Sequence, residues 1–295
     1  MFRGMASRLH FVALVPVLFS LTAFILSMLC IFAGSKTGYL ESADLFTLNT
    51  SMLGQTFLST QKVAATPKNS VGNNVHKEVN KAVGDAAKQL NIHDFYSAHI
   101  LDYCEGDYSA STGSDSKSSP TKKVTFCSNQ TAYFYFDPTS VIEKELKHGV
   151  NITDLKWPSA IQDAVRVLEL SSKAMFFFYA TGAAAAASAL VGAMYGAVVG
   201  SKLSAFVNII ISVIAFFSLM VASAISTAII NQIVDAVNTY GHDVGVFATK
   251  GMTFIHMTWA ATILVLISGF VWAFAFIKRR RGKVAYPMDQ QDISE

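Results

Sequence analysis

Four long apolar stretches constrain what this 295-residue chain can fold into. They cover residues 11–33, 174–199, 203–230 and 252–277, and none of them contains Asp, Glu, Lys or Arg. A helix needs about 20 apolar residues to cross the hydrocarbon core of a bilayer. The composition agrees, because 52% of the residues are hydrophobic and only 15% are charged. The sequence therefore predicts a mainly α membrane protein with a four-helix transmembrane bundle.

The third stretch has a further consequence. At about 1.5 Å per residue it is longer than a hydrocarbon core of about 30 Å, so we expect this helix to tilt or to protrude from the bilayer.

Basic residues predict the orientation of the bundle. Arg3 and Arg8 precede the first stretch, Lys202 lies between the second and third, and a basic run follows the fourth. Loops rich in Lys and Arg stay in the cytoplasm. Both termini are therefore expected inside, and segments 34–173 and 231–251 outside. A cleaved signal peptide is the alternative for the first stretch, but its apolar run exceeds the usual length of about 7–15 residues.

These expectations divide the chain into nine parts. In order, they are a cytoplasmic N-terminus (1–10), a first span (11–33), an extracellular domain (34–173), a second span (174–199), a cytoplasmic turn (200–202), a third span (203–230), an extracellular loop (231–251), a fourth span (252–277) and a basic cytoplasmic tail (278–295).

Three glycosylation sequons support an external location for segment 34–173. They begin at Asn49, Asn129 and Asn151, and each has the pattern Asn-X-Ser/Thr. The alternative is that these sequons are unused, because the pattern also arises by chance.

The external segment predicts a small α+β domain. Apolar residues spaced three and four apart from Val71 to Leu90 predict an amphipathic helix that packs against protein. Aromatic and β-branched residues around 95–104, 124–127 and 133–136 are typical of strands. Thr139 or Ser140 is expected to cap a short helix that ends near Gly149. A helix opening at Pro158 is expected to continue into the second span.

Cys104 and Cys127 flank a polar run that carries no signal for structure of its own. Thiols in an oxidising compartment form disulfides, so we expect these two residues to be bonded and to stabilise the domain by about 3 kcal/mol. A metal pair assisted by His93 and His99 is the alternative, but the spacing is poor for zinc. Cys30 lies inside the first span and is expected to be a small packing residue.

Small residues in the second span indicate close packing of helices. Gly192, Gly196 and Gly200 recur every four residues, which lets helix backbones approach closely in lipid. They would pack either within the bundle or against another protein. Because no charged side chain lies inside a span, a pore or transporter is disfavoured. His256 near the end of the fourth span is expected to be interfacial rather than a pH sensor.

The motifs of the common enzyme classes are missing from the sequence. It contains no GxSxG, HExxH, P-loop or GxGxxG pattern. We therefore expect no catalytic residues, cofactor or resident metal. The net charge of +3 is too small to indicate nucleic-acid binding.

The layout and three short motifs resemble a known family. The motifs are Tyr103-Cys104-Glu105-Gly106, then Cys127-Ser128, then Phe134-Tyr135-Phe136-Asp137-Pro138. One span, a long loop with two cysteines, three spans and a basic tail resemble the claudin-like superfamily. The motifs look more closely like the fungal Sur-seven/PalI family of plasma-membrane proteins.

The sequence departs from the claudin pattern at two positions. Leu101 stands where claudin-like proteins carry Trp, and His99 stands in place of a glycine. These departures weaken a junction-forming interpretation. The short tail after Ile277 also disfavours the long-tailed PalI members that act in ambient-pH signalling.

The resemblance implies a non-catalytic function. Members of the family organise cortical patches of the plasma membrane, the furrows lined by eisosomes, and are linked with endocytosis, cell-wall integrity and sporulation. The alternative is a sensor or regulatory subunit in ambient-pH signalling or in calcium entry during mating.

The implied partners are membrane lipids, other plasma-membrane or eisosome proteins, further copies of this chain and the cell wall. The basic run is expected either to contact anionic lipids of the inner leaflet or to act only as a topology signal. It comprises Lys278, Arg279, Arg280, Arg281 and Lys283.

Overall fold

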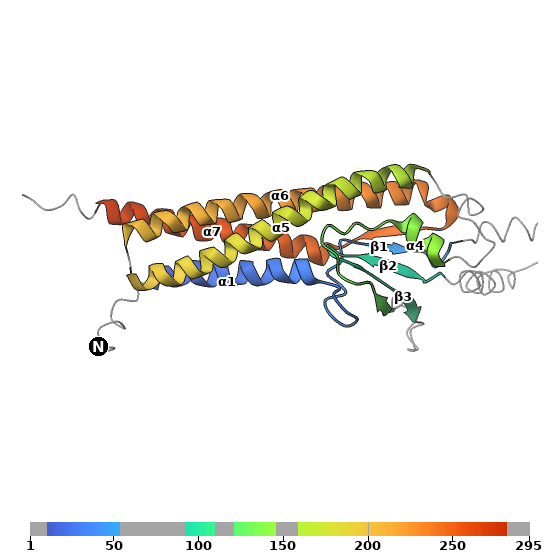
Figure 1. The fold of residues 1–295 in the computed structure, drawn as a ribbon, viewed down its shortest axis with the longest axis horizontal. Helices are drawn as coiled ribbons and strands as arrows, with labels where there is room; N and C mark the ends of the chain where they lie inside the picture. Colours follow the sequence, from blue (N-terminus) through green and yellow to red (C-terminus); the bar gives the residue numbers. More distant parts are fainter. Residues whose placement is uncertain (1–10, 54–91, 110–120, 146–158, 200, 282–295) are drawn as a thin grey trace, which may run out of the picture. The chain divides into compact units, whose positions relative to one another are not determined.

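The computed structural model describes residues 11–53, 92–109, 121–145, 159–199 and 201–281. Its elements are α1 (Phe11–Phe32), β1 (Phe46–Asn49), β2 (Phe95–Ala98), β3 (Tyr103–Ser109), β4 (Thr121–Cys127), α4 (Pro138–Glu145), α5 (Ser159–Val199), α6 (Lys202–Tyr240), the 3-10 turn η3 (His242–Val244), β5 (Phe247–Lys250) and α7 (Met252–Arg281). Figure 1 shows their arrangement along the chain.

The chain forms two compact units. The bundle unit comprises residues 1–28, 178–221 and 258–295, and the sheet unit comprises residues 29–177 and 222–257. The predicted fold class is confirmed, since four helices are long and apolar enough to cross a membrane and a small sheet carries the disulfide.

Two of the four helices, α5 and α6, extend far beyond the apolar stretches within them. Helix α5 begins at Ser159, directly after Pro158, and runs for 41 residues. Helix α6 runs for 39 residues and continues past Ile230 to Tyr240. At about 1.5 Å per residue, α6 is about 58 Å long, almost twice the thickness of a hydrocarbon core.

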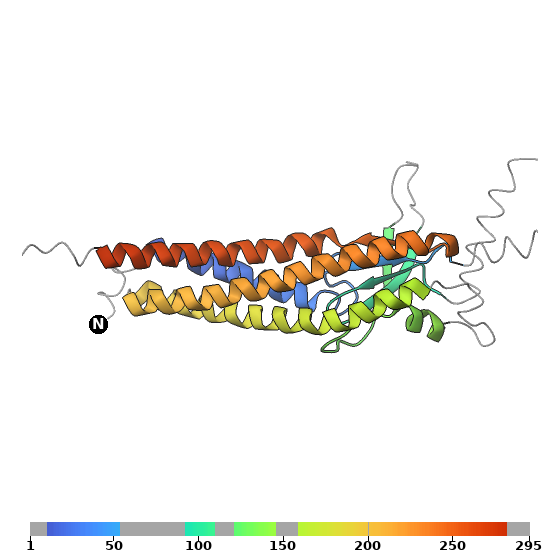
Figure 2. The ribbon, with the colours of Figure 1, turned by 90° about the horizontal axis from the view of Figure 1, so that it is seen from above.

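Hydroxyl and amide groups join the helices of the bundle unit, whose segments run side by side in both views (Figures 1 and 2). Ser20 of α1 lies 3.2 Å from Ser268 of α7 through their hydroxyl oxygens. The hydroxyls of Tyr179 in α5 and Thr258 in α7 lie 2.7 Å apart. Asn208 of α6 donates from Nδ2 to the carbonyl oxygen of Gly192 at 2.9 Å. Such bonds strengthen helix association where water is excluded.

Two of the three predicted packing glycines lie at contacts between helices. A Cβ added to Gly192 would collide with Oδ1 of Asn208, and one added to Gly196 would lie 2.6 Å from Cη2 of Trp272. Trp272 is 2% exposed and packs in a buried cluster with Ala193, Ala197 and Ala205. Gly200 lies outside the described residues.

The sheet unit contains a five-stranded sheet in the order β4-β3-β2-β1-β5. All its pairings are antiparallel. Strand β1 lies between β2 and β5, with Thr47 opposite both Ser97 and Thr249. Because β5 belongs to the loop between α6 and α7, the sheet joins segments from both ends of the chain.

One face of the sheet packs against apolar side chains from the helices. Phe46 and Leu48 of β1 surround a small apolar space together with Phe136, Leu168 of α5 and Val237 of α6. All five are buried. Thr47, which lies between Phe46 and Leu48 on β1, belongs to the other face of the sheet, because successive side chains of a strand point to opposite faces.

Three local expectations differ from the structure. Residues 133–136 form no strand but follow a turn in which the Phe134 amide donates to the Thr131 carbonyl at 3.2 Å. Phe136 is instead a core residue, in edge contact with Phe46 at a centroid distance of 5.9 Å. Segment 46–49 was not expected to be a strand, yet it is an interior strand of the sheet, paired on both edges with β2 and β5.

The cap of α4 also differs from the expectation. Asp137, rather than Thr139 or Ser140, caps the helix, because its Oδ1 accepts the backbone amides of Thr139 at 3.0 Å and Ser140 at 3.3 Å. The helix predicted over 71–90 and the helix end near Gly149 lie outside the described residues.

Gly196→Ala is expected to destabilise the bundle. Its methyl group would lie 2.6 Å from Trp272 and 2.9 Å from the Ser204 hydroxyl, so a neighbour must move. We expect a loss of about 1–3 kcal/mol, measured by thermal unfolding in detergent. Gly269→Ala is the matched control, because its methyl would meet only the Ser212 Cβ at 3.3 Å. Equal melting temperatures for Gly196→Ala and the wild type would contradict close packing here.

Candidate functional site

The predicted disulfide between Cys104 and Cys127 is confirmed. The two residues lie directly opposite each other on β3 and β4, with their Cα atoms 4.0 Å apart. The bond therefore links the edge strand β4 to the rest of the sheet. The third cysteine, Cys30, is buried and free in α1.

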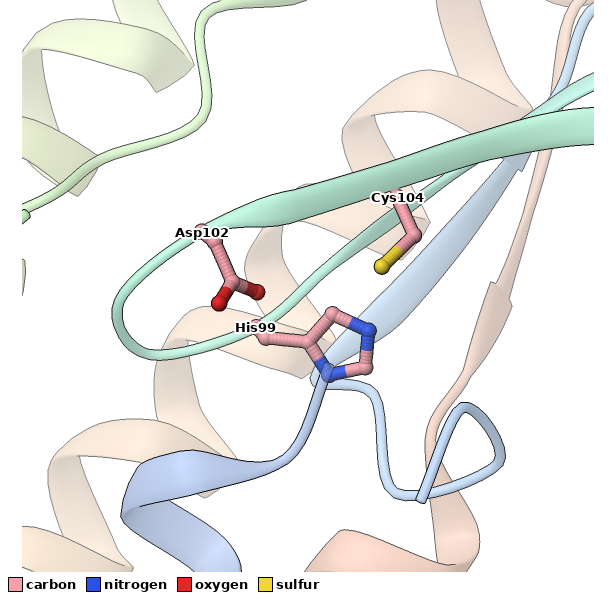
Figure 3. Close-up of side chains that lie close together, drawn as sticks. All are labelled: His99, Asp102 and Cys104. Carbon is pink, nitrogen blue, oxygen red and sulfur yellow. The ribbon is translucent and has the colours of Figure 1, made fainter. Parts of the chain in front are cut away.

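Beside the disulfide lies a buried cluster of His99, Asp102 and Cys104 (Figure 3). A tight turn between β2 and β3 brings them together, since the His99 amide donates to the Asp102 carbonyl at 2.9 Å. One ligand-type atom from each residue lies within 4.8 Å of the others. Figure 3 shows the Asp102 carboxylate and the Cys104 sulfur both close to the imidazole. All three residues are at most 2% exposed.

Gly34 makes room for the His99 ring. Its φ of +76° is in the left-handed region that favours glycine, and an added Cβ would collide with the imidazole. His99, which replaces the glycine of the claudin pattern, is thus accommodated by a glycine just after α1.

Burial shifts the pKa values of the His99 imidazole and the Asp102 carboxyl in opposite directions. Desolvation lowers the pKa of His99 to about 4, and the nearby charge of Lys122 lowers it further, while the backbone of Ala43 opposes the shift. Desolvation raises the pKa of Asp102 to about 6, which Gln130 opposes in part. At neutral pH the imidazole is therefore uncharged, whereas the Asp102 carboxyl becomes neutral only below about pH 6, since a low dielectric disfavours the charged form.

The cluster does not fit a metal ion while the disulfide is intact. The thiolate is the metal-binding form of cysteine, and the sulfur of Cys104 is bonded to Cys127. Only His99 and Asp102 then remain as donors, fewer than the three or four of zinc sites. His93 does not join them, because its Nδ1 lies 3.3 Å from Asp107 instead.

A second site, which the sequence did not predict, lies on the face of the sheet that carries Thr47. The Thr47 hydroxyl donates to Asp44 at 2.5 Å and accepts from the Lys122 ammonium at 2.7 Å. The ammonium also lies 5.5 Å from the centre of the Phe95 ring. Burial raises the pKa of Asp44, while Thr47 and Lys122 partly lower it. These groups line a groove of about 680 Å³.

The sequence carried only a weak signal for this groove. Alternation of apolar and polar residues over 46–49 would have placed Thr47 on its own face. Nothing in the sequence relates Asp44 to Lys122, because the strands that join them are distant in the chain.

The other predicted site residues do not gather at either place. Asn49 is half-buried, and its Oδ1 accepts from the Ser51 amide at 3.0 Å and the Ser51 hydroxyl at 2.7 Å. Asn129 is exposed, and Asn151 lies outside the described residues. Lys278 is exposed near the end of α7, which continues through Arg281, and Lys283 lies outside the described residues.

Removing the disulfide is expected to destabilise the sheet unit. Cys104→Ser together with Cys127→Ser should lower the free energy of unfolding by about 3 kcal/mol, because the bond closes a loop with a sequence separation of 23. Denaturant unfolding monitored by circular dichroism measures the change. Cys30→Ser is the control, and it should leave the difference in gel mobility between reduced and oxidised protein intact. Loss of that difference in Cys30→Ser would contradict the pairing.

The variants Asp102→Asn and His99→Gln are expected to respond to pH with opposite slopes. With Asp102 alone left, stability falls as pH rises from 3.8 to about 6, because the folded state holds the proton more tightly. With His99 alone left, stability falls as pH drops from 6.5 to about 4, because only the unfolded state binds the proton.

Subtracting the pH curve of one variant from that of the other removes the contribution of all other titrating groups, because both variants share them. Melting temperatures measured from pH 4 to 6.5 should therefore diverge, with each group contributing at most about 1.4 kcal/mol per pH unit. Parallel curves would show that neither group is buried in its neutral form.

Comparison with known proteins agrees with this architecture. A search of curated proteins finds no match. The model of the SUR7/PalI family matches residues 12–271, which include α1, the whole sheet, and most of α7. The match therefore covers both compact units and the disulfide between β3 and β4. This chain is a multi-pass membrane protein that belongs to the SUR7/PalI family.

Proposed function

We propose that this chain is a non-catalytic plasma-membrane protein that organises cortical membrane domains of the eisosome type and thereby supports endocytosis, cell-wall integrity or sporulation. The observation that carries the proposal is the family match, which extends over almost the entire chain. A domain organiser must occupy the membrane and present surfaces to lipids and to other proteins.

The bundle unit offers such surfaces. Large apolar side chains point outward from its helices, including Leu18 of α1 at 60% exposed, Leu203 of α6 at 72% and Phe270 of α7 at 65%. In a bilayer these side chains contact lipid tails or the helices of neighbouring proteins. Association in lipid depends on shape and on small residues rather than on hydrophobicity, so such a surface selects partners by fit.

The basic end of α7 supports an inner-leaflet contact. Lys278 is exposed, and Arg279, Arg280 and Arg281 occupy the last turn of the helix. Each basic side chain near an anionic leaflet contributes about 1 kcal/mol. This contact requires both termini to be cytoplasmic and the sheet unit to be external, where the sequons at Asn49, Asn129 and Asn151 would be glycosylated and the wall would be in reach.

Live imaging in a fungal host tests this function. The chain carries a fluorescent tag at its C-terminus, beside a marker of the cortical furrows, and recovery after photobleaching is measured. We expect patches that coincide with the furrows and recover little. Cys104→Ser should disperse them by loosening β4, whereas Cys30→Ser, which breaks no bond, should not. A diffuse, mobile signal for the wild-type chain would refute the organiser function.

A second candidate is a sensor or regulatory subunit in ambient-pH signalling or in mating-related calcium entry. The observation that favours the pH role is the buried pair His99 and Asp102, whose shifted pKa values make stability depend on pH. Lys122 and Gln130 are the charged and polar groups that act on this pair. A sensor would change its distribution with external pH, and His99→Gln combined with Asp102→Asn would abolish the change. Patches that are identical at all pH values would exclude this role.

A further inference from the structure

The groove on the Thr47 face is large enough for a small molecule. Its volume of about 680 Å³ lies within the range of about 300–1,000 Å³ that is typical of ligand sites. It belongs entirely to the sheet unit, and its walls come from the loop after α1, from β1, β2, β4 and β5, and from the first residues of α7.

Hydroxyl groups dominate the polar lining of this groove. Each hydroxyl both donates and accepts a hydrogen bond, which matches a ligand whose own groups do the same. The carboxylates of Glu41 and Asp44 add acceptors, and the ammonium of Lys122 adds donors. The hydroxyl residues are Ser42, Thr47, Ser97, Thr121, Thr249 and Thr253.

The charged groups argue against an anionic ligand. Lys122 already contacts the Thr47 hydroxyl and the Phe95 ring, and the carboxyl groups of Glu41 and Asp44 line the same groove. Lys250 also borders the groove, but it pairs with Phe46, so its Cβ points to the opposite face of the sheet from Thr47. A neutral ligand with many hydroxyls fits this balance better than a phosphate does.

A hydrogen-bond chain fixes the polar groups in advance. Thr47 donates to Asp44 and accepts from Lys122, so its hydroxyl has a single orientation. The ammonium keeps two further N–H donors for a ligand. Leu40, Val124 and Met252 supply apolar surface for the C–H faces of a ring.

The groove also lies at the start of a membrane span. Gly251, Met252 and Thr253 line it, and α7, the fourth membrane helix, begins at Met252. A ligand in the groove would therefore contact the residues with which the fourth membrane helix begins.

We infer that this groove binds a neutral sugar or polyol ring that is the headgroup of a membrane lipid. The ring hydroxyls bond to the serine and threonine side chains, to the Asp44 and Glu41 carboxylates and to the Lys122 ammonium. The lipid tails remain in the bilayer beside α7. The inference rests on the groove and on the membrane helix that begins beside it, and it does not depend on the proposed cortical function.

The test uses the full chain in phosphatidylcholine nanodiscs. Binding of glucosylceramide, with ceramide as the headgroup-free comparison, is measured by native mass spectrometry. Free methyl glucoside and myo-inositol 1-phosphate are measured by saturation-transfer NMR. We expect glucosylceramide to bind at least tenfold more tightly than ceramide, methyl glucoside to bind weakly, and the phosphate to bind no better than methyl glucoside.

Two variants at exposed positions address the groove with little risk to folding. Lys122→Gln removes the ammonium, and Thr249→Arg places a bulky side chain beside Thr47; each should lower the preference for glucosylceramide at least tenfold. Lys123→Gln is the matched control, because Lys123 neighbours Lys122 on β4 but does not line the groove. Melting temperatures verify that the variants fold.

Each remaining outcome contradicts part of the inference. Equal binding of glucosylceramide and ceramide, or an unchanged preference in both folded variants, would refute a ring site in the groove. Tighter binding of the inositol phosphate would refute the neutral headgroup. Binding of methyl glucoside without any preference for glucosylceramide would refute the membrane lipid as the source of the ring.

Discussion

The backbone pairing of β1 with both β2 and β5 is the interaction on which the sheet unit depends. Phe46–Asn49 follows the first membrane helix, and Phe247–Lys250 precedes the fourth, so four residues connect distant parts of the chain. The same strand divides the unit chemically. Phe46 and Leu48 face the apolar helices, whereas Thr47 faces the groove. A shift of one residue in the register would exchange these faces.

Polar groups have different tasks in the two units. In the bundle unit, short bonds such as those of Tyr179 and Asn208 join helices where no water competes. In the sheet unit, the ionisable side chains of His99 and Asp102 are at most 2% exposed, and Ala43 and Gln130 offset only part of their desolvation. Desolvation disfavours their charged forms, which makes the stability of the unit depend on pH. The imidazole thus lies close to both a covalent link and a titratable carboxyl.

The sequence predicted the features that follow from local physical rules. Membrane helices require long apolar stretches, and two cysteines in one loop bond readily, so the four helices and the Cys104–Cys127 pair were foreseen. Strand β1 was not foreseen, because its polar and apolar residues alternate over only four positions. The N-terminal cap of α4 was predicted at Thr139 or Ser140 instead of Asp137. Shifts of one or two residues are common at helix ends. The groove could not be predicted, since Asp44, Thr47 and Lys122 meet only after the strands have paired.

The pairing of β1 with β5, which lies late in the chain, affects the order in which the sheet can form during biosynthesis. A ribosome delivers β1 and β2 early, but β5 emerges only after α5 and α6 have been made. Until then the edge of β1 that later pairs with β5 presents unpaired amide and carbonyl groups, which can template pairing with another chain. The sheet therefore closes last, when the third helix has entered the bilayer and its following loop has returned to β1. During this interval the unpaired edge of β1 must be shielded from other chains. A chain truncated before residue 247 would keep this strand edge unpaired permanently.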